Sequence, residues 1–322
     1  MILSSDNSHR SSIEVERTIK DLFGRPVDNL RVSVTQRCNL RCFYCHKEGE
    51  VSPVDREMTE DEIERIVRIA RDLGIAKVKL TGGEPLMRPK IVDIVRKLSS
   101  LPLLREVAMT TNGIFLNQLA QSLKTAGLKR INVSLGSLNS HTYKAITGVD
   151  ALPQVIAGIK AAGKVGLSPI KVNMVILKGV NEKQISAMIE FTRQNELILQ
   201  LIEFETPDTN GEYYIHYHTN MTDIEQQLER RATKIETRRL HKRKRYLLKD
   251  GGEVEVVRPM HNTTFCNSCS RLRITSDGKF KPCLFRTDNL VDFLTPLRSG
   301  ATDKEIEKLL FEAVQQRQPF FT

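Results

Sequence analysis

The chain contains no tryptophan, and aromatic residues make up only 6% of its 322 residues. Proteins that bind single-stranded nucleic acid stack bases on aromatic rings, so this scarcity argues against that class. The sequence also lacks any apolar run near the roughly 20 residues that cross a bilayer. Its N-terminal segment, MILSSDNSHRSSIEVERTIK, has no apolar core of a secretory signal. We therefore expect a cytoplasmic protein without membrane contact.

The six cysteines form two groups of three, and neither group has a fourth cysteine. They are Cys38, Cys42 and Cys45, spaced x3 and x2, and Cys266, Cys269 and Cys283, spaced x2 and x13. Three thiolates suit a cubic iron–sulfur cluster with one open iron, whereas a structural zinc site is normally closed by four ligands. Disulfides would be unusual in a chain long enough to bury a large core. A zinc site completed by His46 or His261 remains an alternative, and it carries more weight at the second group.

The balance of charge points to an anionic partner. The net charge is +10, and nine Lys or Arg residues lie between Arg230 and Arg245. A charge run of this kind is commonly a solvated face, but it also fits nucleic acid or a polyphosphate ligand. The remaining composition, 40% hydrophobic and 27% charged, is that of an ordinary globular protein.

Strand-like and helix-like segments alternate six times before residue 232. The strands are predicted at 30–34, 76–80, 106–110, 130–135, 170–176 and 199–204, and later helices near 88–100, 117–126, 152–165, 182–195 and 222–231. Ahead of the first helix, Thr59 and Glu62 have capping-box spacing, and Gly74 supplies its end. This alternation predicts an α/β fold with a parallel sheet, as a partial (β/α)6 TIM-like barrel.

Each predicted strand has an apolar and a polar face. The apolar positions are Val32, Val34, Val78, Leu80, Ile131, Val133, Leu135, Val172 and Met174; the polar ones are Arg31, Ser33, Lys77, Lys79, Asn132, Ser134, Lys171, Asn173, Glu203 and Glu205. Since side chains alternate along a strand, the apolar set should face the helices. A closed barrel normally fills its interior with branched apolar residues, so the polar set predicts a lumen for a charged ligand. An open sheet with a wet face is the alternative.

The pattern changes after residue 232. A basic strand-like segment at 234–248, the turn Asp250-Gly251-Gly252 and residues 253–258 have the signature of a hairpin. The second cysteine group follows, and a terminal helix is predicted at 303–315. We therefore divide the chain into a barrel core, residues 1–231, and a C-terminal region, residues 232–322.

The first cysteine group directly follows the first predicted strand, where barrel active sites lie. Its sequence, CNLRCFYC, resembles the signature of the radical S-adenosylmethionine (SAM) superfamily, which has this spacing and an aromatic residue before the last cysteine. The segment TGGEP at the end of the second strand strengthens the resemblance. It implies a 4Fe-4S cluster whose open iron binds SAM and whose electron releases a 5′-deoxyadenosyl radical.

The longer pattern resembles one family of that superfamily, the GTP 3′,8-cyclases of molybdenum cofactor biosynthesis. The segments LRVSVTQRCN, KLTGGEPLMR, MTTNG, INVSL, KVNMVILKGVN and CNSCSRLRITSDGKFKPCLF carry this resemblance. It implies a second 4Fe-4S cluster in the C-terminal region, whose open iron binds the purine of GTP. It also implies hydrogen abstraction from C3′ of GTP and attack on C8, giving (8S)-3′,8-cyclo-7,8-dihydroguanosine 5′-triphosphate.

The resemblance assigns roles to individual positions. It implies Cys38, Cys42 and Cys45 as ligands of the first cluster, Cys266, Cys269 and Cys283 as ligands of the second, and Tyr44, Gly83 and Ser134 as SAM contacts. It implies Arg31, Lys79, Thr110, Lys171, Arg271, Leu272 and Arg273 as GTP contacts. Arg271 and Arg273 count as catalytic together with the first three cysteines. The strand pattern independently places Arg31, Lys79, Ser134 and Lys171 in the lumen.

The resemblance also implies partners, namely a ferredoxin- or flavodoxin-type reductant and a downstream cyclic pyranopterin monophosphate synthase. Nucleic acid is not expected, and a homodimer is left open. Two rival functions remain. One is a radical SAM enzyme that modifies peptides or matures sulfatases, although such enzymes usually carry more C-terminal cysteines. The other is a zinc-bearing nucleic-acid-binding protein that uses the basic run.

The chain departs from bacterial members of the family at three places. Lys79 stands where they have Arg, and Glu205 stands where they have Met. They end in a Gly-Gly tail, whereas no glycine follows Gly300 here. We expect Phe320 and Phe321 to anchor the terminal helix on apolar surface rather than to enter a polar lumen.

Overall fold

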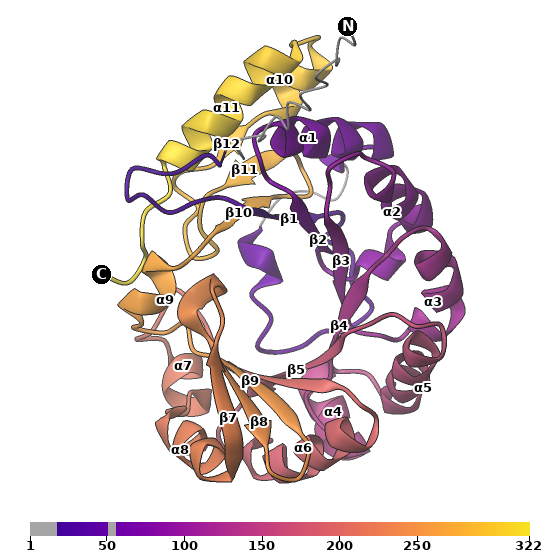
Figure 1. The fold of residues 1–322 in the computed structure, drawn as a ribbon, viewed down its shortest axis with the longest axis vertical. Coiled ribbons are helices and arrows are strands. Elements are labelled where there is room, and N and C mark those ends of the chain that lie inside the picture. The colour runs from indigo at the N-terminus through magenta and orange to yellow at the C-terminus, as the bar shows by residue number, and fades with distance from the viewer. Residues whose placement is uncertain (1–17, 51–55) are drawn as a thin grey trace, which may run out of the picture.

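The computed structural model describes residues 18–50 and 56–322, so most of the segment inspected above for a secretory signal lies outside the described residues. A twisted sheet curves around a central space, with helices on its outer side (Figure 1). Its middle consists of β1 (Asn29–Ser33), β2 (Lys77–Thr81), β3 (Glu106–Thr111), β4 (Arg130–Ser134), β5 (Ile170–Ile176) and β6 (Ile198–Glu203), each parallel to the next. The predicted partial (β/α)6 barrel is confirmed.

Helices connect these strands and cover the outer face of the sheet. They are α1 (Glu60–Asp72), α2 (Ile91–Ser99), α3 (Leu116–Thr125), α4 (Ser140–Thr147), α5 (Leu152–Lys164) and α6 (Ile185–Gln194). The capping box of Thr59 and Glu62 is present at the start of α1. Gly74 has a φ of 90° just after this helix, a conformation that glycine adopts without strain. The sequence pattern had not predicted α4.

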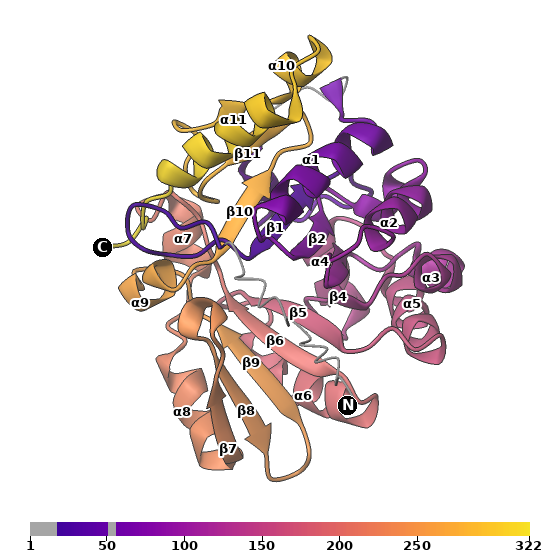
Figure 2. The same ribbon diagram turned by 45° about the horizontal axis from the view of Figure 1, so that its top comes forward.

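The C-terminal third of the chain extends the sheet at both edges (Figure 2). β10 (Arg271–Ile274) lies parallel to β1 and continues into the antiparallel strands β11 (Lys279–Lys281) and β12 (Val291–Asp292). At the other edge β9 (Glu253–Val257) lies parallel to β6, followed by the antiparallel strands β8 (Lys244–Leu248) and β7 (Ala232–Thr237). The remaining helices are α7 (Glu212–Tyr217), α8 (Thr222–Arg231), α9 (Thr263–Asn267), α10 (Leu294–Arg298) and α11 (Asp303–Gln315).

The β8–β9 hairpin and the terminal helix confirm their predictions, but the basic segment at 234–248 is not a single strand. It forms β7 and β8, which are joined through a short 3-10 turn at Leu240–Lys242. His241 takes a φ of 62° in this turn, and its ring stacks on Phe265 of α9 at a centroid distance of 3.8 Å. Basic residues carry no turn signal of the Gly or Pro kind, so the sequence did not reveal the reversal.

The two strand faces behave largely as predicted. All nine apolar positions named above are at most 1% exposed and belong to one hydrophobic core between sheet and helices. On the polar face, Arg31, Lys77, Lys79, Asn132, Lys171, Asn173 and Glu205 line a central cavity. Ser33, Ser134 and Glu203 are not among its lining residues.

The prediction for Glu203 was wrong. This residue shares a strand face with Leu199 and Leu201, which are buried in the core, so alternation directs it away from the cavity. There it lies 2.9 Å from the His218 ring nitrogen and accepts a hydrogen bond from the Met260 amide at 3.0 Å. No helix within the described ranges is both long and apolar enough to span a membrane.

Candidate active site

The first cysteine group lies in the loop between β1 and α1, at the carboxyl ends of the parallel strands. Backbone hydrogen bonds fix this loop to the segment after β2. The Gly83 amide donates to the Thr35 carbonyl at 2.7 Å, and the Glu84 amide donates to the Arg37 carbonyl at 2.8 Å. The sheet therefore positions the chain directly ahead of Cys38.

The two glycines after β2 allow this close approach. A Cβ on Gly83 would lie 2.4 Å from the Gln36 carbonyl oxygen, and one on Gly82 would lie 2.2 Å from that of Thr35. Gly82 also has a φ of 143°, which other residues rarely adopt. Packing of the cysteine loop on β2 thus requires both glycines, whatever ligand they contact.

Glu84 is buried and joins this loop to the end of β3. Its carboxyl group accepts hydrogen bonds from the Thr111 hydroxyl and the Asn112 amide, both at 2.6 Å, and from the Leu86 amide at 2.9 Å. Burial nevertheless raises the pKa of Glu84 to about 7. A neighbouring ammonium group would favour its ionised form.

The three thiols of the first group lie close enough to influence one another. Burial, with contributions from Cys45 and Cys38, raises the pKa of Cys42 to about 12. Metal binding would have to displace these protons. His46 is engaged elsewhere, because its Nδ1 accepts a hydrogen bond from the Glu48 amide at 3.1 Å and its Nε2 lies 3.4 Å from the Glu205 carboxylate.

The second cysteine group lies at the cavity wall. Cys266 is on α9, Cys269 follows this helix, and Cys283 follows β11. Burial raises the pKa of Cys283, and the other two thiols contribute, so these three also lie together. Burial alone would raise the pKa of Cys269, but the nearby Arg317 and Arg271 lower it. Cationic surroundings of this kind favour a thiolate, the form that binds iron.

Neither cysteine group, all of whose members are among the described residues, forms a compact site for a single metal ion. Across residues 18–50 and 56–322, no three His, Cys, Asp or Glu side chains gather tightly enough to hold one metal ion. A cluster in which each thiolate binds its own iron needs no such convergence. His261, the other candidate zinc ligand, packs against Phe321 at a ring distance of 4.9 Å. The zinc alternatives therefore gain no support from the described residues.

A cavity of about 660 Å³ lies at the centre of the curved sheet, and all three cysteines of the second group line it. Its thirteen basic residues are Arg25, Arg31, Lys77, Lys79, Arg130, Lys171, Arg238, Arg239, Arg243, Arg245, Arg271, Arg273 and Arg317. Its five acidic ones are Asp28, Glu106, Glu196, Glu205 and Glu253. Such an excess of positive charge in a concave site attracts an anion of several charges.

Several polar groups around the cavity lack partners of opposite charge among the described residues. Lys79 donates to the Asn132 side chain at 2.8 Å but forms no ion pair, and Arg271 forms none either. Burial and then neighbouring cations lower the pKa of both side chains. Among the cavity-lining residues, the buried Nε atoms of Arg31 and Arg243 have no hydrogen-bond partner. The Oγ1 atom of Thr110 has none either, but Thr110 is not among the residues that line either cavity. These groups are suited to an anionic ligand.

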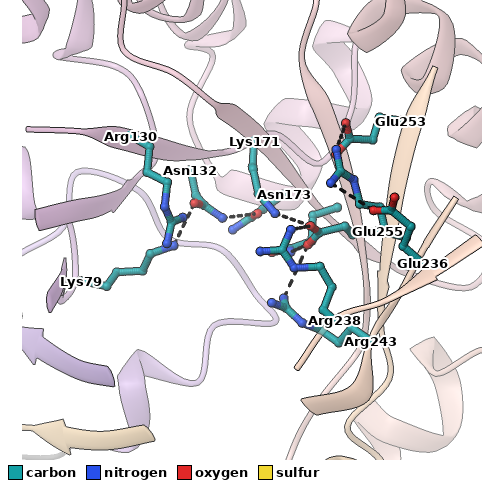
Figure 3. Close-up of polar contacts among 12 residues, drawn as sticks. Lys79, Arg130, Asn132, Lys171, Asn173, Glu236, Arg238, Arg243, Glu253 and Glu255 are labelled. Carbon is teal, nitrogen blue, oxygen red and sulfur yellow. Dashed lines mark hydrogen bonds and ion pairs between the residues drawn. The ribbon is translucent and has the colours of Figure 1, made fainter. Parts of the chain in front are cut away.

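One buried carboxylate organises the cations at the β5–β9 side of the cavity (Figure 3). Glu255 is 0% exposed and pairs with Lys171, with Arg238 at 3.3 Å and with Arg243 at 3.8 Å. It also accepts a hydrogen bond from the side-chain amide of Gln200 at 2.8 Å. Burial alone would raise the pKa of Glu255, but the three cations lower it to about 2. Its single charge leaves a local surplus of cations.

A second carboxylate, Glu48, holds two of the predicted GTP contacts. It pairs with Arg273 and with Arg31 at 3.5 Å, and it accepts a hydrogen bond from the Thr81 hydroxyl at 2.9 Å. Burial would raise the pKa of Glu48, but the two arginines lower it to about 2. Glu48 therefore holds the two guanidinium groups close together. An anion that binds to them would compete with the Glu48 carboxylate.

A smaller cavity of about 350 Å³ lies beside the first cysteine group and borders the main cavity. Tyr44 and Cys45 line it, and it shares Glu205, Leu284 and Phe285 with the larger cavity. Ser134, at the end of β4, is half-buried and lines neither cavity. A ligand at the first cysteine group would thus be next to a ligand in the main cavity.

Two expectations about side chains need correction. Leu272 is 0% exposed in the hydrophobic core, because it alternates with Arg271 and Arg273 on β10, so only its backbone can face a substrate. Phe320 was expected to stay out of the lumen, but it lines the main cavity and contacts Phe285 at a ring distance of 5.1 Å. The aromatic wall beside the second cysteine group accommodates it.

The structure adds site residues that motif reasoning missed. Arg238 and Arg243 belong to the basic run, which reverses direction at the β7–β8 turn. Because of this reversal, some of its basic side chains line the cavity. Other members of the run point outward, as Arg231 pairs with Asp250 and Lys244 with Glu229 at the surface. The charge density of the run was the available signal, but only the turn decides which cations face inward.

Comparison with known proteins shows what the chain is similar to. The radical SAM superfamily profile matches residues 32–192, and the Molybdenum Cofactor Synthesis C profile matches residues 197–322. A probable GTP 3′,8-cyclase of Thermococcus kodakarensis is 51% identical, with 94% of this chain and 99% of that protein covered. A protein of the same description from Methanocaldococcus jannaschii is 44% identical, again with coverage of 94% and 99%.

Solved structures with little sequence similarity share the fold. Streptococcus suis SuiB bound to S-adenosylmethionine has a TM-score of 0.63 and 18% identity, and the match covers 91% of this chain and 67% of that one. The enzyme anSMEcpe with bound AdoMet has a TM-score of 0.62 and 15% identity, with coverage of 91% and 84%. At these identities the similarity concerns the fold alone.

The Glu255 cluster leads to a prediction about stability. Glu255→Gln should lower the free energy of unfolding at pH 7 by about 3 kcal/mol, because Lys171 and Arg243 would remain buried without their carboxylate. The folded-state pKa of Glu255 is below the ordinary value of 4.5, so the advantage of the wild type should be complete above pH 4.5 and shrink as pH falls toward 2. Urea unfolding followed by circular dichroism measures this. Glu190→Gln, which alters an exposed pair with Arg193, should have little effect; equal stability of wild type and Glu255→Gln at pH 7 would contradict the assignment.

Proposed function

The chain belongs to the radical SAM superfamily and, within it, to the GTP 3′,8-cyclase family, and we propose that it converts GTP to (8S)-3′,8-cyclo-7,8-dihydroguanosine 5′-triphosphate. This reaction is an early step of molybdenum cofactor biosynthesis. The observation that carries the proposal is the cationic cavity, which is lined by the second cysteine group and has the charge needed for a nucleoside triphosphate. The smaller cavity, lined by Cys45, shares three lining residues with it.

We assign the first cysteine group as the radical-generating centre. A 4Fe-4S cluster on Cys38, Cys42 and Cys45, with SAM on its open iron, supplies an organic radical when bound. Cys38 and Cys45 are exposed, and Cys45 lines the smaller cavity, so SAM could reach the cluster from that side. Tyr44, Gly83 and Ser134 are the proposed SAM contacts, and Glu84 is placed to pair with an ammonium group near them.

The second cysteine group and the cavity form the proposed substrate site. Cys266, Cys269 and Cys283 would hold a second 4Fe-4S cluster against which the guanine binds. The proposed contacts to the rest of GTP are Arg31, Lys79, Thr110, Lys171, Arg271, the backbone of Leu272, and Arg273, to which the structure adds Arg238 and Arg243. Guanidinium groups bind phosphate oxygens in pairs, and several are already oriented by Glu48 and Glu255.

The two rival functions are less well supported. The comparison favours the cyclase over the peptide-modifying or sulfatase-maturing rival, because relatives about half identical over nearly the whole length are named probable GTP 3′,8-cyclases. The nucleic-acid rival relies on the basic run, but four of its nine basic residues, Arg238, Arg239, Arg243 and Arg245, line the main cavity. A ferredoxin- or flavodoxin-type reductant, a downstream cyclic pyranopterin monophosphate synthase, a homodimer and a cytoplasmic location stay proposals.

The function is tested by anaerobic incubation of the reconstituted protein with GTP, SAM and reductant, followed by mass analysis of the nucleotide. We expect a product isomeric with GTP, together with 5′-deoxyadenosine. Omission of GTP provides the control for uncoupled SAM cleavage. Deoxyadenosine without any nucleotide-derived product, in the presence of GTP, would favour the peptide-modifying rival.

The second cluster predicts the iron content. Two 4Fe-4S clusters imply about eight irons and eight sulfides per chain, so changing Cys266, Cys269 and Cys283 together to Ala should remove about half of each. Cleavage of SAM should persist, since the first group is intact. Iron and sulfide assays after anaerobic reconstitution measure the change, and a triple variant with its full iron content would rule out a cluster at this group.

Lys79 should favour substrate binding at the expense of stability. Lys79→Gln should weaken GTP binding about ten- to a hundredfold, roughly 1.5–3 kcal/mol for a charged contact. Its unfolding free energy without GTP should stay equal or rise, because a half-buried cation without a carboxylate partner is removed. Anaerobic calorimetry and urea unfolding measure the two effects, with the exposed Lys97→Gln as control. Unchanged GTP affinity in a destabilised Lys79→Gln protein would contradict this role.

A further inference from the structure

Three segments that are far apart in the sequence meet behind the second cysteine group. They are the turn of residues 21–25 ahead of β1, the α9 segment with Cys266 and Cys269, and Arg317 after α11. Figures 1 and 2 both show the indigo segment before β1, the helix α9 and the yellow end of the chain beside one another. None of the roles assigned above explains why charged residues are buried at this junction.

The centre of the junction is Asp21, whose side chain is 0% exposed. Its carboxylate pairs with the Arg25 guanidinium at 2.8 Å and with that of Arg317 at 3.1 Å. It also accepts hydrogen bonds from the amides of Phe23 at 3.0 Å and Arg25 at 2.9 Å. One carboxylate thus holds two guanidinium groups, which leaves a net positive charge in a buried position.

Each guanidinium group donates its free N–H groups to the cysteine segment. Arg25 donates to the carbonyl of Cys266 at 2.9 Å. Arg317, only 1% exposed, donates to the carbonyl of Cys269 at 2.6 Å and to that of Arg25 at 3.3 Å. Burial of a charge is costly unless it is paired and hydrogen-bonded, and here the compensating bonds end on the backbone of two cysteines.

We propose that Asp21, Arg25 and Arg317 are positioning residues for the second cluster. They hold the backbone of Cys266 and Cys269 in the conformation that presents both thiolates, and they place positive charge behind the cluster. Hydrogen bonds and charges outside the ligand shell orient the ligands and set the reduction potential of iron–sulfur clusters. A net cation there stabilises the reduced, more negative state. This inference rests on the second cluster of the proposed function.

The test compares Arg317→Gln, Arg317→Lys and the exposed control Arg193→Gln after anaerobic purification and reconstitution. Iron content, electron paramagnetic resonance of the reduced protein and the midpoint potential of each cluster are measured. The triple variant of Cys266, Cys269 and Cys283 identifies which signal belongs to the second cluster. The signal of the first cluster, with its change on addition of SAM, serves as an internal standard.

We expect Arg317→Gln to lose iron at the second cluster, or to retain it with an altered spectrum and a lower potential, while the first cluster is unchanged. Arg317→Lys keeps the positive charge but removes the planar guanidinium group that donates to two carbonyls. It should therefore retain a potential near that of the wild type with an altered spectrum. Arg193→Gln should match the wild type throughout.

Full iron content with an unchanged spectrum and potential of the second cluster in Arg317→Gln would overturn the proposal. If that variant does not fold, a wild-type spectrum in Arg317→Lys would overturn it as well. A different failure is visible in the triple cysteine variant. If that variant keeps all its iron, the assignment of a second cluster to these cysteines is wrong. The proposed binding site for guanine would then be wrong as well.

Discussion

The electrostatic cost of many cations around one internal cavity is the constraint on which the rest of the structure depends. Glu255 and Glu48 each hold several basic side chains, but their charges do not balance the cations that line the cavity. Lys79 and Arg271 have no carboxylate partner among the described residues. The apolar outer faces of the same strands supply the burial that offsets this repulsion. A polyanionic substrate completes the balance of charge.

If Lys79 and Arg271 contact the substrate as proposed, this constraint couples substrate binding and stability in opposite directions. A half-buried cation without a carboxylate partner destabilises the free protein, and it has already lost part of its hydration when an anion binds. The carboxylates act as internal anions that keep the cations in place between turnovers. The strands supply the rigid frame, since their backbone positions are fixed by neighbours on both sides.

The sequence predicted the barrel because its signals were local and repeated. Alternation along β1, β2, β4 and β5 predicted correctly that Arg31, Lys79 and Lys171 face the lumen. It failed at Glu203, which shares a face of β6 with the buried Leu199 and Leu201. Arg238 and Arg243 were missed because their direction depends on the His241 turn and its stacking on Phe265, a contact between distant segments. The roles of Tyr44, Gly83 and Ser134 stay predictions from resemblance.

The placement of β9 and β10 has a consequence for how the chain is made. Leu30 of β1 lies opposite Leu272 of β10, so the first strand leaves the ribosome long before its outer neighbour does. Until then β1 and β6 present unpaired, largely apolar edges of the kind that join other chains. Contacts of such long sequence separation also slow folding. The nascent barrel therefore depends on its last third to cover the outer edges of both strands.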